Sequence, residues 1–162
     1  MITEQEENCT IQLDNIIICQ EFWKDQLHAV DNVSTEQSKQ RIMAITHCQE
    51  PVIKLYGYLM RYKFFQLGVD NKAMANATDK IEFCIQFCTE FLKFFCRSLP
   101  PNQQLVFNHF DSLTENITDE THFIEVLKAI YTSNRHLCEN NCEEIIELFN
   151  KLLYTYGRRA KF

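Results

Sequence analysis

Five cysteine and histidine residues have spacings that could bind a metal ion. His136, Cys138 and Cys142 lie together in the segment HLCENNC, and Cys84 and Cys88 are four residues apart in CIQFC. Residues four apart share a helix face, and thiolate and imidazole are common zinc ligands. However, phenylalanine and isoleucine surround Cys84 and Cys88, and an expected turn separates Cys138 from Cys142. We therefore expect core or surface thiols, with no metal and no cofactor.

Motifs of the common enzyme classes are missing from the sequence. It contains no GxSxG, no Walker loop and no GxGxxG, and its three glycines leave little material for a phosphate-binding loop. His109 lies between Phe107 and Phe110 in FNHFD, where a packed, hydrogen-bonded imidazole is more common than a catalytic one. We therefore expect a protein that is not an enzyme.

Charge and hydropathy narrow the classes of partner. The net charge of −6 is spread evenly, and no basic block of the kind that binds phosphates occurs, so we expect no nucleic acid partner. No run of about 18 apolar residues exists, so we expect no membrane span in this chain. The first ten residues, MITEQEENCT, are acidic and polar, unlike a signal peptide. We expect free thiols in a reducing compartment and a soluble chain.

The elements that must position these side chains are helices. Glycine and proline occur only three times each, and no segment shows the sustained alternation of a strand. Apolar residues instead recur at helical spacing, and capping residues and breaks divide them into six to seven helices. These are expected at about 11–30, at 34–67 with a kink or break at Pro51, at 79–98, after Pro101 through Leu113, from a cap at Thr118 to Tyr131, and from a cap at Asn140 or Asn141 to Gly157.

The helix at 79–98 is the most apolar of them. Its stripe from Ile81 to Phe95 is widened by further phenylalanines, so only a narrow polar edge remains. A helix that is apolar over most of its circumference is covered on more than one side, and we expect it at the centre of the fold. Short loops predict antiparallel helix pairs, stacked as an armadillo-like α-solenoid segment within one helical domain, residues 1–162.

The Pro100–Pro101 pair predicts a sharp corner after this central helix. Arg97, Asn102 and Gln103 flank it, and polar side chains at such a place can bond the loose backbone ends of two helices. We expect Arg97→Ala to loosen this corner with little loss of core. The residues predicted to define the corner or to interact there are Phe91, Phe95, Cys96, Arg97, Asn102, Gln103, Phe107 and His109.

The same segment resembles the RIH domain of intracellular calcium-release channels, the inositol trisphosphate and ryanodine receptors. That family shows Phe-Leu-x-x-Phe-Cys-Arg, a short break, Asn-Gln and then Phe-x-His-x-x-x-Leu. A second likeness lies in AIYTSNRHLCENNCEEIIELFNKLLYTYGRR. The resemblance covers about 80–160, whereas 1–79 share only their helical character. The matching residues are Phe91, Leu92, Phe95, Cys96, Arg97, Asn102, Gln103, Phe107, His109, Leu113, Glu115, Asn116, Asn134, Leu137, Cys138, Thr155, Gly157 and Arg158.

The resemblance implies an armadillo-type helical stack that helps to pass ligand binding to a pore. The chain would then be a non-catalytic domain or fragment of such a channel, on the cytoplasmic side of the endoplasmic reticulum membrane. Its partners would be neighbouring domains or subunits of the channel assembly. The family's pore is absent here, and no cluster matches its basic ligand pocket, so we assign no ligand residues.

An alternative interpretation is a free-standing helical bundle of the Bcl-2-like kind, whose apolar groove holds a partner helix. Such a bundle needs one central helix ringed by others, and the 79–98 helix could serve. No Asn-Trp-Gly-Arg-like motif occurs, and Trp23 is the only tryptophan.

Overall fold

The computed structural model describes residues 33–66, 75–114 and 121–156, and these ranges contain helices joined by turns, with no strand. The all-α prediction is therefore confirmed, whereas the helix expected at 11–30 lies outside the described residues. The helices are α2 (Val33–Ile45), α3 (Gln49–Gln66), α4 (Ala75–Cys96), α5 (Pro100–Phe107), α6 (Phe110–Thr114), α7 (Thr121–Tyr131), α8 (Arg135–Asn140) and α9 (Cys142–Tyr156).

The described ranges hold eight helices, so the expected number of six to seven was wrong. One cause is the helix expected through Leu113, which is divided into α5 and α6. At the division, the N–H of Asn108 reaches Gln104 O and Val106 O, and His109 N bonds Val106 O at 3.0 Å. This tightening ends the α-helical hydrogen-bond pattern for one turn. It also brings the rings of Phe107 and Phe110 to a centroid distance of 5.3 Å.

A second cause is the short helix α8, which the sequence pattern did not predict as a helix of its own between α7 and α9. The side-chain oxygen of Asn134 accepts a hydrogen bond from Leu137 N at 3.1 Å and so caps the start of α8. The side chain of Asn141 donates to Leu137 O at 3.1 Å beyond its end. An asparagine therefore closes each end of this helix, and α9 starts directly afterwards.

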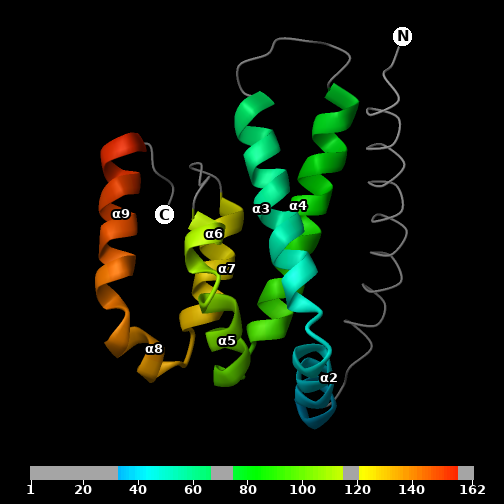
Figure 1. Ribbon diagram of the computed structural model, residues 1–162, viewed down its shortest axis with the longest axis vertical. Coiled ribbons are helices and arrows are strands. Elements are labelled where there is room, and N and C mark those ends of the chain that lie inside the picture. Colours follow the sequence, from blue (N-terminus) through cyan, green and yellow to red (C-terminus); the bar gives the residue numbers. More distant parts are fainter. Residues whose placement is uncertain (1–32, 67–74, 115–120, 157–162) are drawn as a thin grey trace.

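The break expected near Pro51 divides the chain into α2 and α3. It falls at residues 46–48, before the proline, and Pro51 lies in the first turn of α3, where its missing N–H costs no hydrogen bond. His47, Ser98 and Ser133 have φ values of 54°, 53° and 60°. These residues lie just after the ends of α2, α4 and α7, in the α2–α3, α4–α5 and α7–α8 connections. All three connections lie toward the lower end of the molecule in Figure 1.

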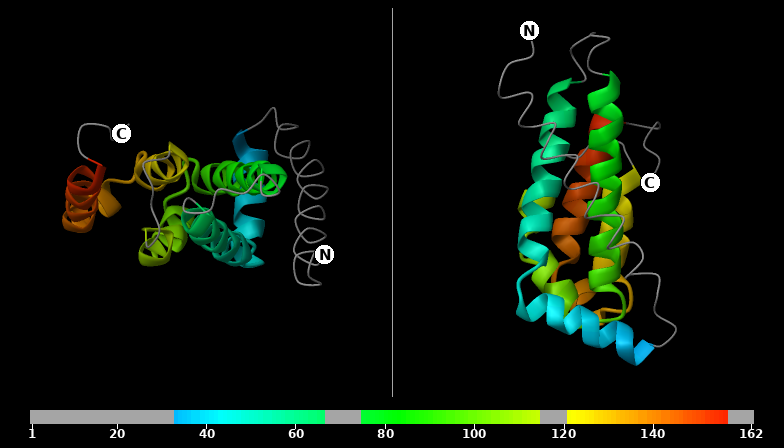
Figure 2. Two further views of the ribbon diagram at one scale, coloured as in Figure 1. Left: turned by 90° about the horizontal axis from the view of Figure 1, so that it is seen from above. Right: turned by 90° about the vertical axis from the view of Figure 1, so that its right-hand side faces the viewer.

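The central position predicted for the 79–98 helix is confirmed by α4, which contacts α2, α3, α5 and α7. In Figure 1, α3 and α9 run upward, whereas α4 and α7 both run downward because α5 and α6 return the chain between them. Helix α2 lies across the lower end of α3 and α4 (Figures 1 and 2). Ile85, Leu92 and Phe95 of α4 are fully buried with Tyr56 of α3 and Ile130 of α7. Stacking of such pairs into an armadillo-like solenoid stays a prediction.

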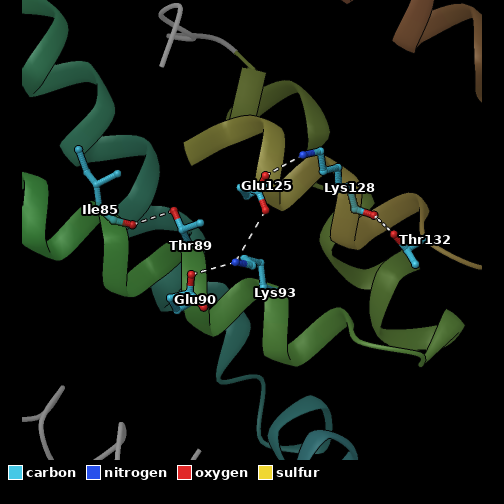
Figure 3. Close-up of polar contacts among 7 residues, drawn as sticks. All are labelled: Ile85, Thr89, Glu90, Lys93, Glu125, Lys128 and Thr132. Carbon is cyan, nitrogen blue, oxygen red and sulfur yellow. Dashed lines mark hydrogen bonds and ion pairs between the residues drawn. The ribbon is translucent and has the colours of Figure 1, made fainter. Parts of the chain in front are cut away.

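Charged side chains join α4 to α7 at the surface (Figure 3). Lys93 Nζ lies 2.9 Å from Glu90 Oε1 and 3.8 Å from Glu125 Oε2, and Lys128 Nζ lies 2.8 Å from Glu125 Oε1. The hydrogen bond from Lys128 holds the pKa of Glu125 below its ordinary value. Because these pairs are exposed, each contributes little to stability, and the buried core holds the two helices together.

Among the described residues, we find no helix that combines the length and apolar character needed to cross a membrane.

Candidate functional site

The corner between α4 and α5 begins with a reversal of the backbone. After α4 ends at Cys96, Ser98 adopts the left-handed conformation with a φ of 53°, and Leu99 N bonds Cys96 O at 3.3 Å. The two prolines then occupy the first positions of α5, where no intrahelical donor is needed. The backbone N–H groups of Asn102 and Gln103 both donate to Leu99 O, at 3.0 and 3.1 Å. The corner is therefore short, and main-chain hydrogen bonds join its residues.

Asn102 binds the end of α4 from the first turn of α5. Its side chain is 2% exposed, and its Nδ2 donates to Phe95 O at 3.0 Å and to Gln40 O at 3.2 Å. The last carbonyls of a helix have no partner within it, so Phe95 O needs a donor from outside. Asn102 supplies that donor and also ties α5 to the backbone of α2.

Gln40 approaches the same helix end from α2. Its side chain is fully buried, and its Nε2 donates to Phe94 O at 2.5 Å and to Arg97 O at 3.0 Å. Three carbonyls at the end of α4 are thus held by two side-chain amides. Because every partner of these NH₂ groups is a carbonyl oxygen, the orientation of both amides follows from their acceptors.

Gln103 performs the matching task for α7. It is 1% exposed, and its Nε2 donates to Ala129 O at 3.0 Å and to Thr132 O at 2.8 Å, at the end of α7. Adjacent residues of α5 therefore cap two different helices: Asn102 caps α4 at the proline corner, whereas Gln103 caps α7, which is not one of the helices that meet at the prolines. We call Gln40, Asn102 and Gln103 the amide corner; it joins α2, α4, α5 and α7.

Arg97 takes part in the corner mainly through its backbone. Its carbonyl accepts the hydrogen bond from Gln40, whereas its exposed guanidinium lies 3.3 Å from Glu36 Oε1 of α2. An exposed ion pair contributes at most about 1 kcal/mol. The small loss of core stability expected for Arg97→Ala agrees with this geometry, and the buried link between α2 and α4 belongs to Gln40.

The aromatic residues predicted for the corner have different environments. Phe91 and Phe95 are buried in α4 and stack with ring centroids 6.2 Å apart. Phe107 is half-buried, and its ring meets Tyr131 edge-on at 6.0 Å. Cys96 is fully buried beside the α4 terminus, whereas His109 is half-buried in the α5–α6 turn. The structure thus places Phe95, Cys96, Asn102 and Gln103 at the buried corner and His109 one helix further along.

Sequence reasoning did not find Gln40. The residue stands in a polar segment, EQSKQRI, and its partners on α4 lie more than 50 positions further along the chain. One signal was available, because Gln40 is three residues before Met43, and both face the core. A glutamine on the apolar side of an otherwise polar helix needs a buried partner.

A comparison with known protein families decides the assignment. The sequence profile of the RIH domain matches residues 15–162. The chain belongs to the RIH domain family. The match extends well before residue 80, so it includes α2 and α3 with Gln40. A search of the solved structures found no match.

A second charged cluster in this RIH domain joins three helices nearer the start of α4. Glu82 of α4 pairs with Lys63 of α3, and its Oε1 lies 2.5 Å from His122 Nε2 of α7. Burial acts to raise the pKa of the Glu82 carboxyl, but hydrogen bonds and charges from Lys63 and His122 outweigh it, and the pKa lies below its ordinary value. The ionised form of Glu82 therefore stabilises the contacts among α3, α4 and α7.

We expect Glu82→Gln to lower the free energy of unfolding at pH 7 by about 0.5–1 kcal/mol, a small value because Glu82 is partly exposed. A depressed carboxyl pKa stabilises the fold above the unfolded pKa, about 4.3, and this contribution disappears as the pH falls through the folded pKa. Urea titrations should therefore show that the free energy of unfolding falls more steeply for the wild type than for the variant as the pH is lowered from 7 to 3. Glu139→Gln, which removes an exposed pair with Arg135, is the control; equal curves for Glu82→Gln and wild type would contradict the expectation.

The six cysteines that the structure describes differ in burial, and Cys48 is intermediate between a buried group and an exposed group. Cys84, Cys88 and Cys96 are buried in α4, and burial raises the pKa of the Cys88 and Cys96 thiols to about 12. Cys138 and Cys142 are exposed. Across the described ranges, no three His, Cys, Asp or Glu side chains gather closely enough to hold a metal ion. The six cysteines in these ranges are free thiols.

Iodoacetamide should modify Cys138 and Cys142 in the folded chain long before the three cysteines of α4. A rise of the thiol pKa from 9.0 to about 12 reduces the reactive thiolate on the order of a thousandfold, and burial slows access further. Peptide mass spectrometry over a time course measures this difference, with urea-unfolded protein as the control in which all sites react. Rapid labelling of Cys88 or Cys96 in native buffer would contradict the buried position of α4.

Proposed function

We propose that this chain is a non-catalytic helical domain of an intracellular ligand-gated calcium-release channel of the inositol trisphosphate or ryanodine receptor kind. It would lie on the cytoplasmic side of the endoplasmic reticulum membrane, with neighbouring domains or subunits of the channel as its partners. Its role would be to pass conformational change from the ligand-binding region to the pore. Membership of the RIH family supports this proposal, because RIH domains belong to multidomain channel assemblies and form a non-enzymatic family.

The amide corner is the observation that carries the mechanical part of the proposal. Buried hydrogen bonds from Gln40, Asn102 and Gln103 fix the ends of α4 and α7 to α2 and α5. Close-packed helices joined in this way move as rigid bodies, so a displacement of α2 turns α4 and α5 with it. A domain with such a joint can transmit a rotation over its length without unfolding.

The family assignment favours this role over the free-standing Bcl-2-like module. The contacts of α4 with four other helices suit either interpretation. Asn102 and Gln103 of the corner, however, lie in the segment whose motif resembles the channel domains, and the family match extends to Gln40 on α2.

The test is ligand-evoked calcium release by the channel that contains this chain, with inositol trisphosphate as the ligand. We expect Gln40→Met, which keeps the apolar stem but removes the donor, to reduce release while ligand binding is unchanged. Arg97→Ala should act in the same direction but more weakly, because it removes only an exposed pair. Lys128→Ala, also at an exposed pair, is the matched control and should gate normally.

Normal release by a folded channel that carries Gln40→Met would overturn the transmission role. Loss of ligand binding together with release would show that the corner maintains the fold and does not transmit motion. An assembled channel with unchanged ligand affinity is therefore required before the release data are interpreted.

A further inference from the structure

The last described helix, α9, has two apolar faces. Leu148 and Leu152 are buried against the rest of the core. Ile146 and Leu153 are 57% and 51% exposed, and Tyr154 is 94% exposed. Helix α9 lies at one edge of the row of helices in Figure 1 and in the left view of Figure 2.

The three exposed residues lie on one side of α9. Ile146, Leu153 and Tyr154 are related by steps of seven and eight residues, which return to the same face of a helix. Leu148 and Leu152 face about 100° or more away from them by the same geometry. Helix α7 provides a contrast, because the large apolar residues described on it are all buried or half-buried. The exposed face of α9 is therefore a second stripe beyond the one that the fold uses.

The charge beside this stripe is negative. Glu143 and Glu147 are exposed and lie three residues before and one residue after Ile146. Lys151, the only Lys or Arg within α9, is four residues after Glu147 and lies about 60° around the helix from Tyr154. The two glutamates outnumber this one lysine beside the stripe. We call Ile146, Leu153, Tyr154, Glu143 and Glu147 the α9 face.

We propose that the α9 face binds an amphipathic helix of a partner protein whose apolar stripe is flanked by lysine or arginine. The seven-residue step from Ile146 to Leu153 matches the spacing with which one helix packs along another. The glutamates beside the stripe attract lysine or arginine at the sides of the partner helix and repel aspartate or glutamate there. Their negative charge therefore favours a basic partner helix over an acidic one. A second copy of the chain is disfavoured, because pairing two α9 faces would bring the glutamates of both copies together.

This surface is distinct from the amide corner, and its test does not depend on the channel role. The probe is a synthetic amphipathic helical peptide with leucines at heptad spacing and lysine flanks. The comparison peptide carries the same leucines with glutamate flanks. Isothermal titration with the full chain should show binding of the lysine-flanked peptide only, and the affinity should fall with added salt because the flanking charges are exposed.

Two variants and one control locate the site. We expect Ile146→Ser with Leu153→Ser to weaken binding of the lysine-flanked peptide at least about tenfold, since central apolar anchors dominate such interfaces. Glu143→Gln with Glu147→Gln should weaken it less and remove most of the salt dependence. Ile42→Ser with Ile45→Ser removes two exposed isoleucines of α2 and should leave binding unchanged. All the changed side chains are exposed, so circular dichroism should show an intact fold for each variant.

Three results would overturn the proposal. The glutamate-flanked peptide could bind as tightly as the lysine-flanked one, which would remove the role of charge. The control at Ile42 and Ile45 could lose as much affinity as the α9 variant, which would place the binding elsewhere. Sedimentation could show a concentration-dependent dimer that Ile146→Ser abolishes, which would identify the face as a contact between copies.

Discussion

Asn102→Ala is expected to lower the free energy of unfolding by about 2–3 kcal/mol, because it removes two buried hydrogen bonds and leaves a carbonyl at the end of α4 without a donor. The lost bonds are those from Nδ2 to Phe95 O and Gln40 O. The alanine cannot replace them, and water has little access to a position that is 2% exposed. Urea unfolding followed by circular dichroism measures the change, as a shift of the midpoint at constant slope.

The matched control for this change is Asn108→Ala, six residues further along the chain and at the opposite end of α5. Asn108 is exposed, and its side chain accepts a hydrogen bond only from Gln104, at 3.0 Å. We expect a loss of no more than about 0.5 kcal/mol for it. Equal effects of the two alanine variants would mean that the buried amide of Asn102 adds nothing to the corner.

Phe95→Ala should have the largest effect of all, a loss of about 4 kcal/mol. The ring is fully buried and stacks on Phe91 with centroids 6.2 Å apart. Its removal leaves a cavity in α4 beside the point where Asn102 binds, and the surrounding helices cannot close it without breaking the corner. The same urea titration measures the loss, and a destabilised variant should also show faster hydrogen exchange in α4.

Phe95→Leu separates the size of the cavity from the loss of the ring. Leucine keeps most of the volume, so we expect a loss of about 1–1.5 kcal/mol. Phe107→Ala is the second control, because Phe107 is only half-buried and should cost less than Phe95→Ala. A Phe95→Ala variant as stable as Phe107→Ala would contradict the central position of α4.

The sequence was a good guide to those features that depend on near neighbours. The wide apolar stripe of 79–98 predicted a central helix, and α4 has that position. Two adjacent prolines predicted a corner, and the structure confirms a helix end at Cys96 and a helix start at Pro100. The capping role expected for Asn102 followed from the free carbonyls that any such break leaves. Each of these arguments needs only a few consecutive residues.

Features that depend on distant segments were missed. Gln40 reaches α4 across more than 50 residues, and the cluster of Lys63, Glu82 and His122 joins three helices. A single sequence does not show which polar side chains will meet when helices pack. The division between α5 and α6 was also missed, because it follows from a tightened turn that no breaking residue marks.

The central claim is that the amide corner acts as one joint between helices, and a double-mutant cycle on Gln40 and Asn102 tests it most directly. The four proteins are the wild type, Gln40→Met, Asn102→Ala and the double variant, with the free energy of unfolding measured for each. If the two amides hold one joint, the second loss matters less once the first has loosened the end of α4, and the coupling energy should be about 1 kcal/mol. Effects that add within about 0.3 kcal/mol would show two independent caps and would contradict the claim.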